Sequence, residues 1–304
     1  MKKTSFILVA LLLATVQSFA SSANNQIFAV DNTDGKITAK TIEEAFNKSG
    51  MTVDVNNNMN SIFEKRYKKT HHKSYNLAIF SNNELVTKLL KEYPGIGRIT
   101  PLSMSIYSDD KKNTINVSTL SLKGMARASG IPETNADLIA YAKMLDKALH
   151  AALPKGKYLE KANTAAAPKN VLTTFTTEFE LEDGETYVDM KDGLKEEFES
   201  EIGSVGFLIP KSYDIATEDY DFYDTYSIIR FNVIFPLSKE HPDAGSYAPF
   251  SLAIYKKEGD DAVNIEFPSI SNWATDLAVS DTEALAEVKK TQSMIQGILE
   301  ELTE

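Results

Sequence analysis

The chain of 304 residues contains no cysteine. It therefore cannot form disulfides, a thiolate nucleophile, or zinc and iron–sulfur sites that depend on cysteine ligands. Basic residues are also in the minority, because 32 Lys and Arg stand against 43 Asp and Glu and give a formal net charge of −11. Binding to nucleic acid or to an anionic membrane surface needs clustered Lys and Arg. The composition therefore argues against both of these classes.

Motifs for catalysis, cofactors and metals are missing as well. The chain has no G-x-S-x-G elbow, no P-loop, no G-x-G-x-x-G turn and no H-E-x-x-H pair. The segment from Asp31 to Gly35 is similar to a calcium loop, but the first position of the loop would fall on Val30 and the twelfth on Thr41, and neither carries a carboxylate. Only four histidines occur, and the adjacent His71 and His72 follow a polar stretch that predicts a solvated pair. We predict no cofactor and no metal.

Residues 1–20 have the pattern of a secretory signal peptide. Lys2 and Lys3 precede a short apolar stretch over residues 6–16, and Ser18 and Ala20 place small residues before a cleavage site. The apolar stretch is too short to cross roughly 30 Å of hydrocarbon. We expect cleavage after Ala20, export to the periplasm, and no membrane span in the mature chain.

The rest of the chain contains an internal repeat. Residues 91–122 align without a gap to residues 239–270 at an offset of 148, and ten of the 32 positions are identical. Upstream, residues 75–80 (YNLAIF) align with residues 226–231 (YSIIRF). Residues 156–170 are rich in Ala, Lys, Asn and Pro and are typical of a linker. The sequence therefore predicts a first repeat over residues 21–155, this linker, and a second repeat over residues 171–304.

Both repeats predict the same order of elements, β-α-β-β-α-β-β-α. Residues 27–30 and 171–181 begin the two copies as strands, and apolar positions such as Ile42 and Phe46 share one face of the helix that follows. Gly50 and Gly206 stand where such a helix would end. Helices on one side of a sheet are the economical packing for this order. We predict an α+β fold, made of two tandem two-layer α/β sandwiches that pack as an intrachain pseudo-dimer.

These blocks resemble the domain of unknown function 302 family. The resemblance rests on residues 80–85, on Pro-x-x-Gly and Pro-led strand motifs over 94–97 and 101–107, and on their counterparts over 242–245 and 249–255. The family implies a compact α/β sandwich and no established catalytic activity. Many members have Asn-Pro where this chain has two asparagines at 82–83, and Pro-Cys where it has residues 101–102 and 249–250. A thiol-dependent role in such members does not extend to this chain.

Strand alternation singles out six polar positions that the repeats share. Leu102, Met104 and Ile106 point to one face of their strand, and the residues between them point to the other. If helices cover the apolar face, the polar face lines a small-ligand site or a surface where the two copies meet. The alternative is that the six are structural positions only. These candidate ligand-binding residues are Ser103, Tyr107, Asn116, Ser251, Tyr255 and Asn264.

Charge divides unequally between the two repeats. Residues 27–155 carry 18 basic and 13 acidic side chains, whereas residues 171–304 carry 9 basic and 29 acidic ones. Opposite net charges favour association of the copies. The alternative is that the acidic half only aids solubility. The acidic and aromatic run over residues 218–224 predicts a solvated loop, or else a site that attracts a cation or a basic partner.

The sequence favours a non-catalytic periplasmic module that binds a small molecule or another periplasmic protein. Two alternatives stay open: a hydrolase-like enzyme with a polar Ser/Tyr/Asn site, and an envelope scaffold. No paired carboxylates can be singled out for acid–base work, because acidic residues are abundant throughout the second repeat.

Overall fold

The structure, a computed structural model, describes residues 23–304 except 110, 161–171, 179–180, 182 and 216. The predicted signal peptide and most of the predicted linker lie outside the described residues. We call residues 23–160 the first half and residues 172–304 the second half. The first half contains β1 (Asn25–Asp31), α1 (Ala39–Lys48), β2 (Thr52–Asn58), α2 (Met59–Tyr67), β3 (Tyr75–Ser81), α3 (Asn83–Leu90), the 3-10 helix η1 (Pro94–Ile99), β4 (Leu102–Asp109), β5 (Thr114–Leu120), α4 (Leu122–Ser129), α5 (Ala136–Ala152) and β6 (Lys157–Tyr158). The second half contains β7 (Leu172–Glu178), α6 (Tyr187–Ser204), β8 (Leu208–Asp214), β9 (Tyr220–Ile229), α7 (Phe231–Ser238), the 3-10 helix η2 (Pro242–Ser246), β10 (Phe250–Lys257), β11 (Ala262–Pro268), α8 (Ile270–Asp276) and α9 (Thr282–Thr303).

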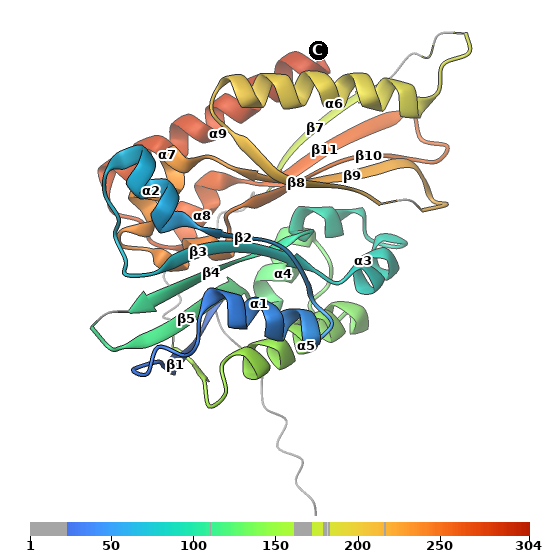
Figure 1. Ribbon diagram of the computed structural model, residues 1–304. Coiled ribbons are helices and arrows are strands. Elements are labelled where there is room, and N and C mark those ends of the chain that lie inside the picture. The colour runs from blue at the N-terminus through green and yellow to red at the C-terminus, as the bar shows by residue number, and fades with distance from the viewer. Residues whose placement is uncertain (1–22, 110, 161–171, 179–180, 182, 216) are drawn as a thin grey trace, which may run out of the picture.

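Each half builds one antiparallel sheet, and the two sheets have corresponding strand orders. The first sheet runs β2-β3-β4-β5-β1-β6 and the second runs β8-β9-β10-β11-β7. Figure 1 shows α1 and α5 beneath the first sheet and α6 and α9 above the second, with the two sheets between these helical layers. Helices packed on antiparallel sheets confirm the predicted α+β class.

Helix periodicity explains how each sheet is covered. In α1, Ile42 and Phe46 are fully buried, and a capping box at Thr38 satisfies backbone donors at the helix start. Phe46 meets Phe80 of β3 at 5.2 Å between ring centroids, and in the second half Phe198 of α6 meets Tyr226 of β9 at 5.4 Å. These aromatic pairs anchor corresponding helices on corresponding strands.

The ends of α1 and α6 follow the predicted pattern. Gly50 and Gly206 lie two residues beyond their helices and both have φ of +89°. A side chain at this position would strain the backbone, so glycine lets the chain reverse directly into β2 and β8.

The short helices α4 and α8 were not in the predicted order of elements, and two other segments form strands that were not predicted. Residues 157–158, placed in the linker, form β6 and pair with β1, because the Tyr158 ring packs on Phe28 at 4.8 Å. Residues 220–224, predicted as a solvated loop, belong to strand β9. Lysines of neighbouring elements neutralise its acidic side chains, since Lys256 reaches Asp221 at 2.7 Å and Lys195 reaches Asp224 at 3.3 Å.

Helix α2 has no counterpart in the second half and was not predicted. It leads to the histidine pair, which the structure places against α7 of the second half instead of in solvent. The His71 ring packs on Phe235 at 4.5 Å between centroids, and His72 donates from Nε2 to the Ser238 carbonyl at 2.6 Å. Tyr67 stacks on the same Phe235 ring at 4.0 Å. This contact adds a second connection between the halves, beside the one made by the sheets.

We expect this contact to make stability sensitive to pH. Burial, followed by the charges of Lys69, His72 and Lys239, lowers the pKa of His71 below its usual 6.5. As the pH falls, His71 is therefore protonated in the unfolded chain before it is protonated in the folded protein. The free energy of unfolding then decreases as the pH falls from about 6.5 to the lowered pKa of the folded state. The variant His71→Gln should lose less free energy of unfolding between pH 7.5 and pH 5 in urea titrations. Identical losses in both proteins would contradict this assignment.

Candidate functional site

The polar faces of the two sheets point toward each other. In the first sheet Ser105 and Ser118 lie opposite one another on β4 and β5, and their hydroxyl oxygens are 2.7 Å apart. Ser118 also donates to the carbonyl of Asp243 in η2, at 3.0 Å. The polar face predicted from strand alternation is therefore real, and residues of the other half cover it. Local periodicity identifies the side chains that share a face, but the covering element comes from more than a hundred residues away.

The two 3-10 helices dock reciprocally on the opposite sheets. In η1, the Gly97 N–H donates to the Tyr223 hydroxyl of β9 at 3.0 Å, and that hydroxyl in turn donates to the Pro94 carbonyl. In η2, Gly245 lies against Ser105, where an added Cβ would stand 2.4 Å from the serine Cβ. Each Pro-x-x-Gly motif thus presents bare backbone to the other half, which explains why this spacing recurs in both.

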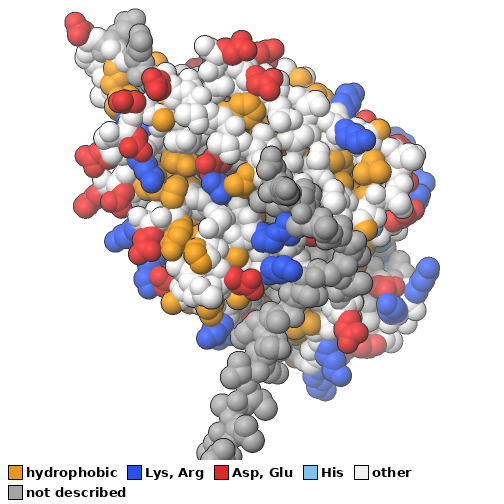
Figure 2. All heavy atoms as spheres, turned by 180° about the vertical axis from the view of Figure 1, so that it is seen from behind, with side chains coloured by type: hydrophobic (Ala, Val, Ile, Leu, Met, Phe, Trp, Pro, Cys, Tyr) orange, Lys and Arg blue, Asp and Glu red, His pale blue; other side chains and the backbone are white. Residues whose placement is uncertain are grey.

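One ion pair joins the halves among the described residues. Arg98 of η1 reaches Glu266 of β11 with Nε–Oε2 at 2.6 Å and Nη2–Oε2 at 2.5 Å, and both side chains are almost buried. The Arg98 Nη1 group donates to the Ser129 carbonyl at 3.2 Å, and Tyr255 donates to Glu266 at 3.2 Å. The two halves differ strongly in net charge, but among the described residues this is the one ion pair formed between them. Figure 2 shows acidic side chains along the upper edge and the left side of the molecule.

A cavity of about 70 Å³ lies where the two halves meet. Its walls come from η1, β4, β5 and α4 of the first half and from the region of η2, β10, β11 and α8 of the second. Many lining positions stand in pairs that are 148 residues apart in the sequence, one from each half. The pairs of the same or similar type are Pro101 and Pro249, Leu102 and Phe250, and Ser103 and Ser251.

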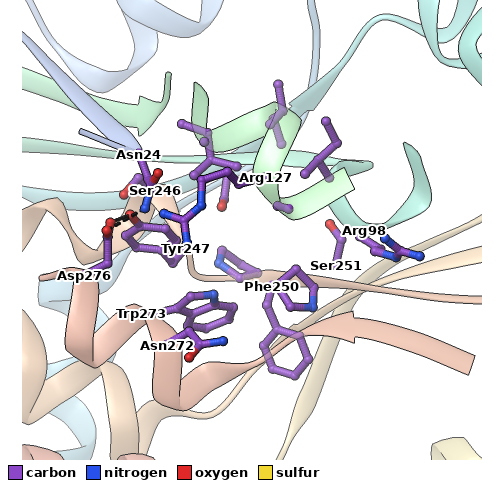
Figure 3. A pocket seen from close by; sticks show the side chains of 18 of the residues that line it. Asn24, Arg98, Arg127, Ser246, Tyr247, Phe250, Ser251, Asn272, Trp273 and Asp276 are labelled. Atoms are coloured by element: carbon purple, nitrogen blue, oxygen red, sulfur yellow. Dashed lines mark hydrogen bonds between the residues drawn. The ribbon is translucent and has the colours of Figure 1, made fainter. Parts of the chain in front are cut away.

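Other paired positions of the cavity have diverged, and they supply its chemical character. Ile99 of the first half corresponds to Tyr247 of the second, and Ala128 corresponds to Asp276. Arg98 corresponds to a serine. Some lining residues are therefore the same in both halves, whereas the charged and aromatic ones are present in one half only. Figure 3 shows these side chains around the cavity, with the Tyr247–Asp276 hydrogen bond at one end.

Polar groups at the Asp276 end already bind one another. Asn24 donates to Asp276 Oδ1 at 2.5 Å and the Tyr247 hydroxyl donates to Oδ2. Burial and this carboxylate raise the pKa of Tyr247 well above its usual value. A tyrosine so disposed stays protonated, and it is poorly suited to act as a base or nucleophile.

The structure does not bring the six predicted polar residues together at one site. Ser103 and Ser251 line the cavity, and Ser251 donates to the Pro101 carbonyl at 2.7 Å. The other four do not line it. Asn116 binds the Tyr107 carbonyl at 3.3 Å within the first sheet, and Asn264 binds the Ala262 carbonyl at 3.4 Å within the second. Tyr255 stacks on Tyr223 with 5.2 Å between ring centroids.

The sequence-based reasoning missed the charged residues of the cavity. Arg98, Arg127 and Asp276 differ from the residues at the related positions of the other half, so a comparison of shared residues does not single them out. A signal exists in retrospect at one position. At the offset of 148 Asp276 stands opposite the apolar Ala128, whereas Arg98 and Arg127 stand opposite the polar Ser246 and Thr275.

Sequence comparison finds a family match within the first half. Residues 28–152 match the family model of the domain of unknown function DUF302. The DUF302 match ends at α5 and leaves the second half unassigned. No curated protein shows significant sequence similarity to the chain.

A solved structure of an uncharacterized conserved DUF302 protein from Bacillus stearothermophilus is also similar to part of the chain. It matches with 10% sequence identity and a TM-score of 0.34, over 44% of this chain and 98% of its own length.

Two further site classes find no support within the described residues. No group of three or more His, Asp or Glu side chains there is placed to hold a metal ion. None of the helices in that part of the chain combines the length and apolar character needed to cross a membrane.

Proposed function

We propose that the protein is an exported, non-catalytic module that binds a small molecule in the cavity between its two halves. The observation that carries the proposal is the diverged lining. Pro101, Leu102 and Ser103 match Pro249, Phe250 and Ser251 in the other half, while charged and aromatic residues stand at only some of the related positions. A mostly apolar concave site with few polar groups is the usual form of a ligand pocket. A purely structural interface has no need to leave such a space unfilled.

We further propose that the second half is a second copy of the domain matched in the first. Corresponding strand orders in the two sheets support this, as do the ten identities between residues 91–122 and 239–270. The paired 3-10 helices that dock on opposite sheets also support it. In this view the interface is that of a symmetric dimer whose two copies share one chain.

The hydrogen bonds and protonation of the hydroxyl groups that line the cavity favour binding over catalysis. The Ser251 hydroxyl is engaged by a backbone carbonyl, and the raised pKa of Tyr247 keeps its proton in place. A hydrolase needs a nucleophile hydrogen-bonded to a base that can take its proton. Ser251 donates to a carbonyl and not to a base, and Tyr247 donates to the Asp276 carboxylate but keeps its proton because its pKa is raised.

Native mass spectrometry of protein recovered from the periplasm tests the function and the export together. We expect a chain that begins at Ser21 and carries a small molecule that is released on unfolding. The variant Ala128→Phe should abolish retention, because residue 128 lines the cavity and the added ring fills it. The control Ala151→Phe adds the same ring at an exposed position of α5 and should retain the molecule. Equal retention by both variants would rule out the cavity as the site.

A further inference from the structure

Arg127 is the cationic group of the cavity that forms no ion pair with the described part of the chain. It lies on α4, is partly exposed, and lines the cavity. Among the described residues it donates no hydrogen bond and lies within 4.0 Å of no carboxylate. Figure 3 shows its side chain extending into the space toward Tyr247. A guanidinium carries five N–H donors in a planar fork, so a free one at a pocket is matched to an anion.

The other charges of the cavity are accounted for. Arg98 is neutralised by Glu266 and adds no free positive charge. Asp276 has both carboxylate oxygens engaged, by Asn24 and by Tyr247. The remaining lining is mostly apolar and includes Leu102 and the rings of Phe250 and Trp273. A ligand that fits has one negative group for Arg127 and an apolar body.

We propose that the ligand is a small monocarboxylate with a short apolar body, whose carboxylate binds the guanidinium of Arg127. This inference rests on the proposed function of the cavity. A guanidinium pairs with a carboxylate through two parallel hydrogen bonds, which gives orientation as well as affinity. A phosphate monoester would bring nearly two charges to a site with one free cation and the Asp276 carboxylate, so it is the poorer match.

The volume of the cavity limits the size of the apolar body. A space of about 70 Å³ accommodates a branched chain of a few carbons but not an extended lipid tail. We therefore choose isovalerate as the probe and its neutral amide, isovaleramide, as the matched compound of the same shape. The two differ at pH 7 only in the charged group that Arg127 would bind.

The test is calorimetric titration of the mature full chain with each probe. Isovalerate should bind roughly ten-fold or more tightly than isovaleramide. The variant Arg127→Gln should remove this preference and leave the amide affinity unchanged. Arg127→Lys should restore part of it, because the charge returns without the planar fork. The control Lys143→Gln removes the same charge from an exposed position of α5 and should bind as the parent does.

The outcomes separate this inference from the function on which it rests. Equal binding of both probes, lost in Ala128→Phe but unchanged in Arg127→Gln, would overturn the carboxylate assignment and support the cavity as a ligand site. Tighter binding of isobutyl phosphate, a phosphate monoester, than of isovalerate would overturn the choice of a monoanion. If neither probe binds and the native protein carries no ligand, both proposals fail.

Discussion

Replacing Glu266 with alanine should destabilise the protein by roughly 3 kcal/mol, because it leaves the guanidinium of Arg98 unpaired between the halves. Arg98 and Glu266 retain only 12% and 9% of their side-chain exposure, so water replaces the lost partner poorly. The loss also removes the acceptor of the Tyr255 hydroxyl. The measurement is the free energy of unfolding from urea titrations.

Two comparisons make this prediction specific. Glu240→Ala removes a carboxylate from the exposed pair with Lys239 and should change stability by less than about 1 kcal/mol. The double variant Arg98→Met with Glu266→Ala should be less destabilised than Glu266→Ala alone, since no buried charge is then left unpaired. A Glu266→Ala protein as stable as the Glu240→Ala protein would show that the pair contributes nothing to the packing of the halves.

Replacing Gly97 with alanine should cost roughly 1 to 3 kcal/mol by overpacking the docking of η1 on the second sheet. The new Cβ would stand 2.2 Å from the Tyr223 hydroxyl and 2.8 Å from the Cβ of Ala253. Tyr223 is fully buried and cannot swing into solvent to make room. Gly245→Ala should behave in the same way, because its Cβ would meet Ser105 and Leu77 of the first sheet.

The matched control is Gly193→Ala. This glycine lies inside α6, where an added Cβ meets nothing within 4 Å, so the same substitution should stabilise the helix by roughly 0.5 to 1 kcal/mol. Urea titration of the three variants checks the contrast. If Gly97→Ala and Gly193→Ala shift stability alike, the close approach of η1 to Tyr223 does not exist in solution.

Much of the local architecture follows from the sequence alone. Apolar spacing marked the buried face of α1 through Ile42 and Phe46, and alternation marked the two faces of β4. The gap-free block of the repeat corresponds to the succession from η1 to α4 in the first half and from η2 to α8 in the second. Such features depend on neighbours within a few residues, which a linear pattern records directly.

Long-range contacts decided the rest. No local pattern distinguishes a polar strand face that meets water from one that another sheet covers, and so Ser103 and Ser251 were correctly placed on a face whose surroundings remained unknown. The same limit hid Arg127, an ordinary helix residue in sequence, whose significance comes from Tyr247 and Asp276 of the other half. The sequence by itself determined which side chains share a face and which residues align at a constant offset of 148. Only the tertiary structure decided that the polar faces meet and enclose a cavity, because burial depends on residues more than a hundred positions away.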